Sequence, residues 1–461
     1  MFRLYIMART IKSLSLPSIL SSVRTCFEQI SDIRNVETPA CNYSQTDILM
    51  SGLAMMFTQE PSMAKFQRNL QNKNNLNNLK TIFSVSQIPE NTQFREVLDL
   101  ISPDDIQQAF LPCAQKFQKT RTWHNYKVLG GRYAVLMDGT AFYHSNALHC
   151  DHCLTTKHSN GAVSYSHKTL VATIAHPDVK VPIPMLLEEI RIEDGYTKQD
   201  CEINAAKRLI PKLAKQHPRL DIICVADGLY SKEPMIDATI KSGLSFIYVA
   251  KPGDHVALEE DLSGLRLCDG VKKLEKKLLK GRIGIYEWSS KVNLNNSTER
   301  KVNWFSYTEK DKNGKIKYRN SWVTDIKPNK NNVVELASIG RQRWQIENEA
   351  FNILKNDGYN LEHNFGHGKQ FLAFNFIILN FLAYMIHQLM KLTDSLYQRA
   401  LEFVGTRKDF WTEIRVLIKR FVWASWQILL EFILELREDM GFDSGYKVII
   451  KRKASKSRIG Y

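Results

Sequence analysis

The feature that most constrains the fold is a pair of buried strands that each end in Asp-Gly. Tyr133–Met137 is a short apolar run that leads into Asp138, and Asp221–Ala226 is a second one that leads into Asp227. Residues 198–216 lie between them and follow a helical pattern. Strands that alternate with helices predict an α/β fold. A carboxylate at the exit of a buried strand can hold a metal, but Asp-Gly is equally common in turns, so each acid alone is ambiguous.

Further strands are predicted on both sides of residue 253. In the first part they are expected at residues 163–175, 181–190 and 244–250. From Gly253 to about Asn332 the chain is basic and hairpin-like, with strands expected at 283–291, 302–309 and 315–325. Asn313-Gly314 marks a tight turn between the last two. This pattern predicts a β-rich insertion.

The residues before about 120 are predicted to be helical. Ser44 can cap an apolar helix that runs to Met56, and Ser102-Pro103 opens another helix toward Lys119. The Asn-rich basic segment 71–80 is expected to be a loop. Such a module could contact DNA or brace the next domain; we favour DNA contact slightly, although no helix-turn-helix spacing is visible.

A helix is predicted over Arg341–Lys355. Its side chains expected to pack are Trp344, Phe351 and Leu354. On a neighbouring flank a carboxylate stands between two cations: Arg343, Glu347 and Lys355. A carboxylate so placed can ligate a metal while the cations hold phosphates. The alternative interpretation is an amphipathic helix with solvated charges.

Composition favours a polyanionic partner. The 461 residues hold 63 Lys plus Arg against 48 Asp plus Glu, a net charge of +15, which points to nucleic acid more often than to a membrane surface. Eight scattered cysteines indicate a reducing compartment. The apolar stretch 371–390 is interrupted by polar residues and is expected to be a buried core helix. The basic tail 447–458 could contact phosphates or simply be solvated.

Cysteine and histidine residues cluster just after the first of the two strands. The segment reads His149-Cys150-Asp-His152-Cys153, with His158 and His167 downstream. Cys-x-x-Cys with nearby histidines suits tetrahedral zinc. The candidate ligands of a structural zinc are therefore Cys150, Cys153, His149 and His152; buried thiols and surface histidines are the alternative. His363 and His367 either lie near the active cleft or are polar groups at a helix end.

The order strand-Asp138, strand-Asp227, β-rich insertion and helix-Glu347 resembles the DDE transposases of bacterial insertion sequences. In particular it is similar to the insertion-sequence-four-like group, whose signature is Tyr, two residues, Arg, three residues, Glu, six residues, Lys. Arg343 and Glu347 match this spacing, Gly340 stands at the Tyr position, and Lys355 comes one residue late. The resemblance covers roughly residues 40 to 400.

The resemblance implies a catalytic triad of Asp138, Asp227 and Glu347 that binds two Mg²⁺ ions, with Mn²⁺ able to substitute. Two divalent ions about 3.5–4 Å apart can activate the attacking oxygen and stabilise the leaving one. Asp138 would bridge both ions, and Asp227 and Glu347 would each complete one shell. Arg343 and Lys355 would grip DNA phosphates, and Trp344 could stack on a base. Asp194, Asp200 and Glu202 are interpreted as helix-capping acids.

The resemblance also implies an RNase H-like mixed sheet flanked by helices, with helical N- and C-terminal parts. The expected divisions are 1–125 (helical, with DNA binding as one role), 126–252 (first part of the catalytic core), 253–332 (β-rich insertion), 333–400 (last part of the core) and 401–461 (helices and basic tail). Transposon ends would be cut to a 3′-OH that attacks target DNA, within a homodimer in the bacterial cytoplasm, associated with the nucleoid and not with a membrane.

Two other functions compete with this one. A catalytically silent DNA-binding descendant of a transposase is the alternative that the sequence leaves open. A phosphatase of the haloacid dehalogenase type, suggested by Met137-Asp138-Gly139-Thr140, would need an aspartate at position 136, where Leu136 stands.

Overall fold

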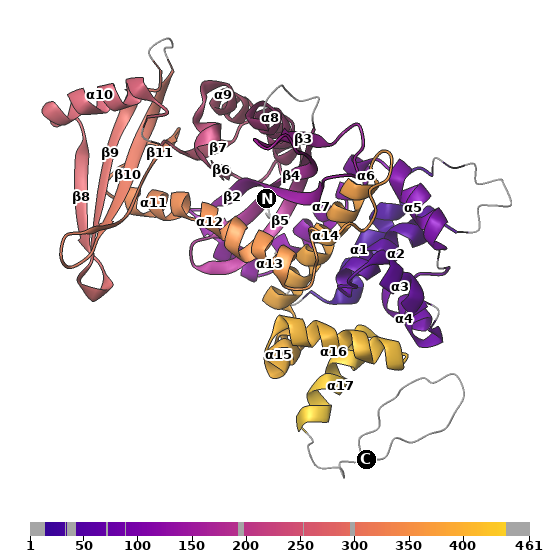
Figure 1. Cartoon of the computed structure of the whole chain (residues 1–461). Helices are drawn as coiled ribbons and strands as arrows, with labels where there is room; N and C mark the ends of the chain where they lie inside the picture. Colours follow the sequence, from indigo (N-terminus) through magenta and orange to yellow (C-terminus); the bar gives the residue numbers. More distant parts are fainter. Residues whose placement is uncertain are drawn as a thin grey trace, which may run out of the picture.

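The fold was analysed in a computed structural model of the chain, shown in Figure 1. It describes residues 14–32, 34, 43–70, 72–87, 89–191, 198–251, 253–295 and 300–438. The basic tail 447–458, Asp194 and the side chain of Asp200 lie outside the described residues.

Helices form the N-terminal part. They are α1 (Leu16–Glu28), α2 (Gln45–Phe57), α3 (Met63–Leu70), α4 (Lys73–Phe83), α5 (Asn91–Leu100), α6 (Pro103–Gln107) and α7 (Phe110–Gln118). The predicted cap of α2 is confirmed, because Ser44 Oγ accepts the Asp47 amide at 3.0 Å. The helix expected from Ser102 to Lys119 is divided into α6 and α7.

The loop predicted for residues 71–80 is wrong, because α4 occupies most of this segment. Leu79 and Phe83 are buried on one side of α4. Asn78 is also buried, and its Nδ2 donates to the carbonyl oxygens of Ile418 at 2.7 Å and Phe421 at 2.6 Å. Contacts with a segment more than 300 residues away therefore stabilise a helix that local composition does not favour.

A mixed sheet forms the centre. Its strands are β1 (Lys127–Val128), β2 (Arg132–Ser145), β3 (Leu154–Lys157), β4 (Val163–His176), β5 (Val179–Ile190), β6 (Ile222–Ala226) and β7 (Ser245–Val249). The core order is β5-β4-β2-β6-β7. Strands β2, β4 and β5 pair antiparallel, whereas β6 and β7 run parallel to β2. This is the expected RNase H-like arrangement of a mixed sheet flanked by helices.

The segment between β7 and the next helix adds strands to the same sheet. It contains α10 (Val256–Leu267), β8 (Lys272–Lys277), η4 (Leu279–Gly281), β9 (Ile283–Asn293), β10 (Lys301–Lys310) and β11 (Ile316–Thr324). Strand β11 pairs antiparallel with β7, with Trp322 opposite Val249. The sheet then continues through β10 and β9 to β8, and α10 crosses these strands and contacts β9 (Figure 1).

Helices cover the central strands. The short helix η1 (Thr122–Tyr126) precedes β1, and α8 (Lys198–Gln216), η3 (Gly228–Ser231) and α9 (Glu233–Lys241) lie between β5 and β7. After the insertion come α11 (Val333–Arg341), α12 (Arg343–Gln345), the π-helical η5 (Ile346–Phe351), α13 (Asn352–Asn356) and α14 (Leu372–Thr393). Figure 1 shows α8 and α9 above the central strands, α13 below them, and α14 rising between the sheet and the N-terminal helices.

The buried core helix predicted at residues 371–390 is confirmed as α14. This helix is the one described segment long and apolar enough to cross a membrane, but 94% of its apolar window is buried inside the protein. It packs against α2 and β5. Its buried Asn375 donates to the carbonyl oxygens of Leu98 and Ile101 at 2.7 and 2.8 Å, so the polar interruptions have partners within the protein.

The chain continues with α15 (Ser395–Val404), α16 (Arg407–Arg420) and α17 (Trp426–Glu438). These helices pack on one another, and α16 also contacts α4. The N- and C-terminal helices therefore form one layer beside the sheet.

Candidate active site

Asp138 lies in the middle of β2, not at its end as the sequence predicts. The strand continues to Ser145 because its outer part still pairs with β4. Its parallel pairing with β6, however, stops at Leu136 opposite Val225. Asp138 is thus the second residue beyond the end of this pairing, and the same register brings it opposite Asp227.

Asp227 directly follows β6 and starts the short helix η3. One of its carboxylate oxygens, Oδ1, accepts the Leu229 amide at 2.9 Å. The side chain of Lys251 lies over Gly228, where a Cβ atom would come within 3.3 Å of it. The Asp-Gly pair therefore forms a tight turn that fixes the carboxylate at the end of the strand.

Glu347 lies in a π-helical turn. The helix predicted over 341–355 is interrupted after α11, and η5 then spans Ile346–Phe351 before α13 resumes regular α-helix. A π turn is an α-helix with one residue inserted, and such turns are frequent at functional sites. Ile346 and Phe351 are buried against the strands, while 44% of the Glu347 side chain is exposed.

The guanidinium group of Arg343 connects two of the predicted acids. Its Nη1 donates to Asp138 Oδ2 at 2.9 Å and to Glu347 Oε1 at 2.6 Å. Burial lowers the pKa of Arg343, but the hydrogen bond to Glu347 and the charges of Asp138 and Asp227 outweigh that effect, so the pKa is raised. The structure thus brings together Arg343 and all three predicted acids.

The site is richer in negative charge than in positive charge. Burial raises the pKa of Asp138 to about 7; Arg343 opposes this rise, and the charge of Glu347 adds to it. Carboxylates held this close in a half-buried site favour an additional cation, and their oxygens are the ligands that Mg²⁺ prefers.

Glu202 is a further acid at this site. From the sequence, this residue is interpreted as a helix-capping acid. Tyr230 Oη donates to Glu202 Oε1 at 3.3 Å, and a Cβ atom on Gly139 would lie 3.6 Å from Glu202 Oε2. The carboxylate of Glu202 therefore lies beside the residue that follows Asp138. A capping role does not account for this position, and only the fold reveals it.

Gly340, which stands at the Tyr position of the signature, is in contact with a tryptophan. A Cβ atom there would lie 2.6 Å from Cε2 of Trp322, a fully buried side chain of β11. Trp322 in turn stacks on Phe305, with ring centroids 5.2 Å apart. An aromatic ring from the insertion therefore occupies the space beside α11 that a side chain at position 340 would need.

The remaining predicted residues of this helix differ in their surroundings. Phe351 and Leu354 are buried as predicted, but the packing predicted for Trp344 is wrong, because 65% of this residue is exposed. Lys355 Nζ lies 2.7 Å from Glu362 Oε1. Because the π turn accommodates one extra residue, Lys355 faces the direction that residue 354 would face in an uninterrupted α-helix.

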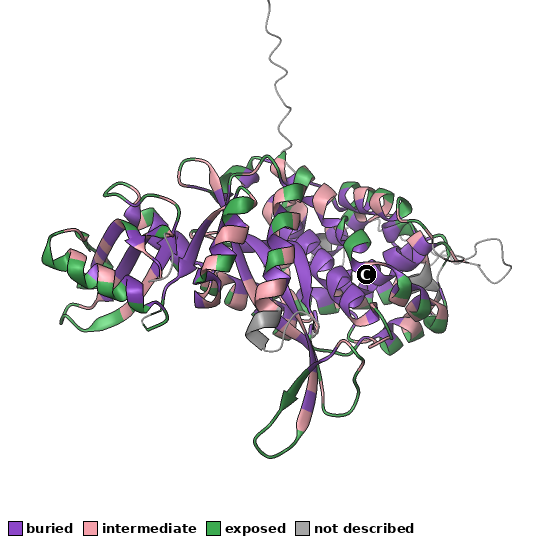
Figure 2. Ribbon diagram, turned by 90° about the horizontal axis from the view of Figure 1, so that it is seen from above, coloured by how far each residue is buried: buried purple, intermediate pink, exposed green. Residues whose placement is uncertain are grey.

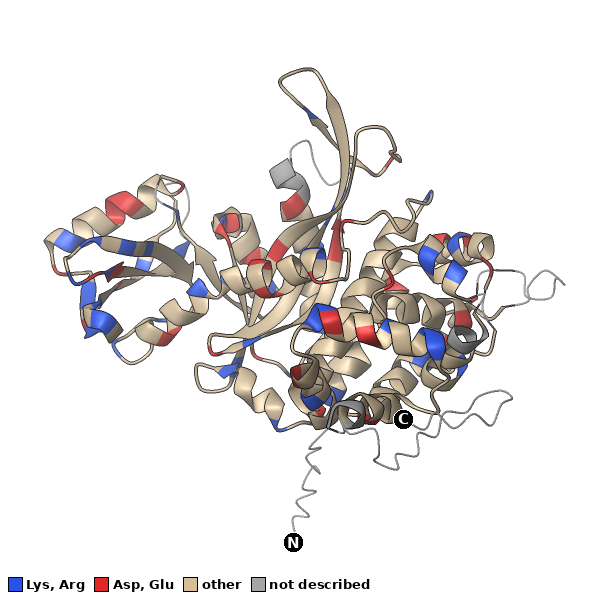
Figure 3. Cartoon of the chain, turned by 60° about the horizontal axis from the view of Figure 1, so that its bottom comes forward, with Lys and Arg blue, Asp and Glu red and all other residues tan. Residues whose placement is uncertain are grey.

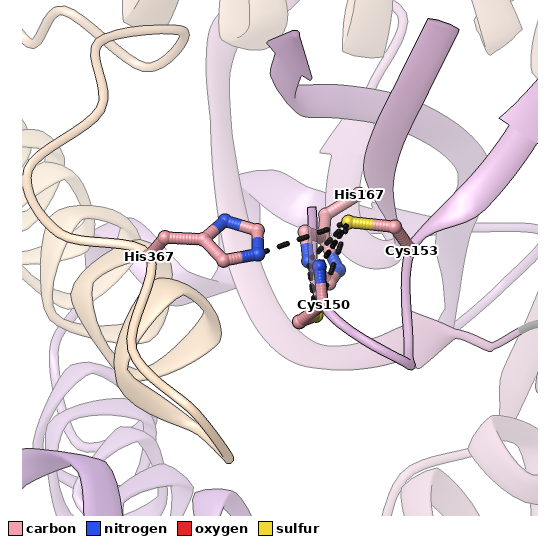
Figure 4. A group of neighbouring side chains, drawn as sticks. All are labelled: Cys150, Cys153, His167 and His367. Atoms are coloured by element: carbon pink, nitrogen blue, oxygen red, sulfur yellow. Dashed lines mark hydrogen bonds between the residues drawn. The ribbon is translucent and has the colours of Figure 1, made fainter. Parts of the chain in front are cut away.

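A cysteine–histidine cluster lies beside strand β4 of the same sheet (Figure 4). The ligand atoms of Cys150, Cys153, His167 and His367 all lie within 4.8 Å of one another. This corrects the predicted set in its two histidines. His149 instead stacks on Tyr165, with ring centroids 4.2 Å apart, and His152 is not part of the cluster.

The mixed central sheet flanked by helices defines the class: an α/β protein with an RNase H-like fold. Residues 196–386 match the family model of the transposase DDE domain, which supports a DDE transposase. Asp227 and Glu347 lie within the matched residues and Asp138 lies before them. No curated protein matches the chain.

Proposed function

We propose that this protein is a DDE transposase that cuts transposon-end phosphodiester bonds and joins the resulting 3′-OH to target DNA. The observation that carries the proposal is the convergence of Asp138, Asp227 and Glu347 on Arg343, in a chain that matches a transposase DDE domain. The group with the Tyr-Arg-Glu-Lys signature is the one we propose, on the spacing of Arg343 and Glu347.

Asp138, Asp227 and Glu347 would hold Mg²⁺, for which Mn²⁺ could substitute. The donor set fits, because it consists of carboxylate oxygens in excess over the neighbouring cation. Such ions, when bound, activate the attacking oxygen and neutralise charge on the leaving one. Asp138 and Asp227 are held on rigid backbone, since one lies within a strand and the other directly follows one.

Arg343 has two roles in this proposal. In the protein alone, its guanidinium neutralises the charges of Asp138 and Glu347. With DNA bound, the same group would donate to a backbone phosphate, because a guanidinium binds phosphate and carboxylate oxygens by the same geometry. Lys355 would make a further phosphate contact by exchanging Glu362 for DNA.

DNA contacts away from the acids would use exposed aromatic and basic side chains. Trp344 is adjacent to Arg343 and exposed enough to stack on a base. Figure 3 shows Lys and Arg residues in the insertion and in the helical layer, with Asp and Glu residues more concentrated between them. On β8 the exposed lysines are Lys272, Lys273, Lys276 and Lys277. We propose that DNA follows these basic surfaces to the acids, and that two copies of the chain hold two ends together.

The proposal is tested by joining element-end DNA, taken from the sequences that flank the coding region, to a plasmid target in Mg²⁺. Precut ends with a 3′-OH should be joined, and ends with a 3′-dideoxy nucleotide should not. Asp227→Asn should abolish joining, whereas Asp221→Asn, a matched change of an exposed acid that pairs with Arg132, should not. DNA binding with no cleavage or joining under any condition would favour the silent DNA-binding alternative.

A further inference from the structure

The four residues of the cysteine–histidine cluster come from three separate segments. Cys150 and Cys153 lie in the loop between β2 and β3, His167 lies on β4, and His367 lies in the loop between α13 and α14. Figure 4 shows His367 approaching the other three side chains from its own segment of the chain. Two sulfur and two nitrogen donors thus come together, although more than 200 residues of sequence separate Cys153 from His367.

The distances within the cluster agree with the edges of a zinc tetrahedron. The Sγ atoms of Cys150 and Cys153 are 3.8 Å apart. The Nε2 atom of His167 lies 3.4 and 3.3 Å from these two sulfurs, and His367 Nε2 lies 3.8 Å from Cys153 Sγ. Zn–S and Zn–N bonds in a tetrahedral site place sulfurs ~3.8 Å apart and sulfur ~3.5 Å from nitrogen. The same sulfur separation is far beyond the ~2 Å of a disulfide bond.

The surroundings of the ligands also resemble those of a metal site. The Nε2 atoms of both histidines face the sulfurs, and Nδ1 of His167 lies 3.4 Å from Oε1 of the buried Glu189. A carboxylate near the far nitrogen is one of the usual outer partners of a metal-bound histidine. The Cys150 amide points to Cys153 Sγ at 3.5 Å, and the Cys153 amide donates to the Cys150 carbonyl at 3.2 Å. This compact turn aims both sulfurs at one point.

The position of His367 is fixed independently of the cluster. Asp99 of α5 accepts four successive backbone amides, from residues 369 to 372, at 2.8 to 3.0 Å. Gly368 has a φ of +71°, and a Cβ atom there would lie 2.5 Å from Asp99 Oδ1. The backbone beside His367 is therefore held in one conformation, which lowers the entropic cost of bringing its imidazole to the cluster.

We propose that Cys150, Cys153, His167 and His367 bind one Zn²⁺ ion with a structural role. Four protein donors fill a tetrahedral shell and leave no position for substrate, so this site differs in kind from the carboxylate site. The ion would join the β2–β4 hairpin to the segment that follows the Glu347 helix. Beyond the site, residues 155–162, which include the turn between β3 and β4, are all exposed. Figure 2 shows an exposed hairpin that projects from the body. The ion would thus fix the base of the β3–β4 hairpin relative to Asp138.

The proposal does not depend on transposase activity, and metal analysis tests it directly. Untagged protein purified without chelators should contain close to one zinc per chain by mass spectrometry. His367→Gln and Cys153→Ser should lose most of it, whereas the matched change His149→Gln should not. A wild-type protein with almost no zinc, including after refolding in Zn²⁺, would overturn the proposal, as would an equal loss from His149→Gln.

A second measurement covers the case in which the ligand variants fail to fold. Wild-type protein exchanged into Co²⁺ should show the intense visible bands of a tetrahedral ion and the near-ultraviolet charge transfer of two thiolates. The weak spectrum of an octahedral oxygen site would overturn the assignment. Removal of the metal should also raise the rate of proteolysis within residues 155–162, and an unchanged rate would overturn the structural role.

Discussion

The contact between Gly340 and Trp322 predicts a large difference between two Gly→Ala substitutions. In Gly340→Ala, the new Cβ would lie 2.6 Å from Trp322 Cε2 and 2.7 Å from its Nε1. Contact between carbon atoms is favourable at about 3.5–4.0 Å, so the ring or the helix must move by about 1 Å. Trp322 is fully buried and stacked on Phe305, which leaves it no free direction.

Overpacking of this kind costs about 1–3 kcal/mol, and the gain in helix propensity returns up to about 1 kcal/mol. We therefore expect Gly340→Ala to destabilise the protein by about 1–2 kcal/mol. The matched control is Gly264→Ala in α10, where the new Cβ meets nothing within 4 Å and the change should stabilise by up to about 1 kcal/mol.

Thermal unfolding followed by circular dichroism measures the difference, because about 1 kcal/mol corresponds to a shift of about 2–4 °C in Tm for domains of about 150–250 residues, and to a smaller shift if all 461 residues unfold together. Gly340→Ala should melt several degrees below Gly264→Ala, and Trp322→Leu should relieve part of the loss in the double variant. Equal midpoints for the two alanine variants would refute the packing argument.

Further predictions concern the helix that carries Glu347 and a buried histidine. Trp344→Ala should leave Tm unchanged, because the side chain is exposed, but weaken DNA binding by about 1–3 kcal/mol in gel-shift titrations; Leu267→Ala, a change of a still more exposed apolar residue, should alter neither. Arg343→Gln should lower Tm in EDTA, because two carboxylates lose their shared cation, and Mg²⁺ should restore most of the loss; an equal loss in both buffers would contradict this. Burial lowers the pKa of His217 to about 4 in the folded protein. As the pH falls, this imidazole therefore binds a proton in the unfolded chain before it does so in the folded protein. The free energy of unfolding should then drop by ~2 kcal/mol between about pH 7 and about pH 5. Denaturant titrations of His217→Gln should show a smaller drop, and an unchanged pH profile would contradict the argument.

The local pattern of apolar and polar residues was sufficient to predict α8, β6 and β7 of the central core. The helix predicted at 198–216 has the bounds of α8, and β6 and β7 differ from their predicted ranges by one residue at their ends. Buried parallel strands are continuous apolar runs, and α8 has an apolar side that recurs at helical spacing. Strand β8 was missed because its sequence, Lys-Lys-Leu-Glu-Lys-Lys, carries no apolar alternation; pairing with β9 determines its conformation.

The candidate sites depend on contacts that spacing does not encode. The sequence nominated Asp138, Asp227 and Glu347 through their order, and the parallel register of β2 and β6 gives the physical reason why the first two meet. It could not nominate His367 as a partner of Cys153, because 214 residues separate them. The position of Glu202 beside Gly139 likewise follows from the packing of α8 on the sheet.

The most direct test of the central claim is metal-dependent nicking of element-end DNA by the wild type and by Glu347→Gln. Glu349→Gln, a matched change two residues along the same π turn, serves as the control. The account predicts nicking in Mg²⁺ or Mn²⁺ that Glu347→Gln abolishes while it retains DNA binding, and that Glu349→Gln preserves. Nicking by Glu347→Gln at the wild-type rate would contradict the assignment of Glu347 to the metal site.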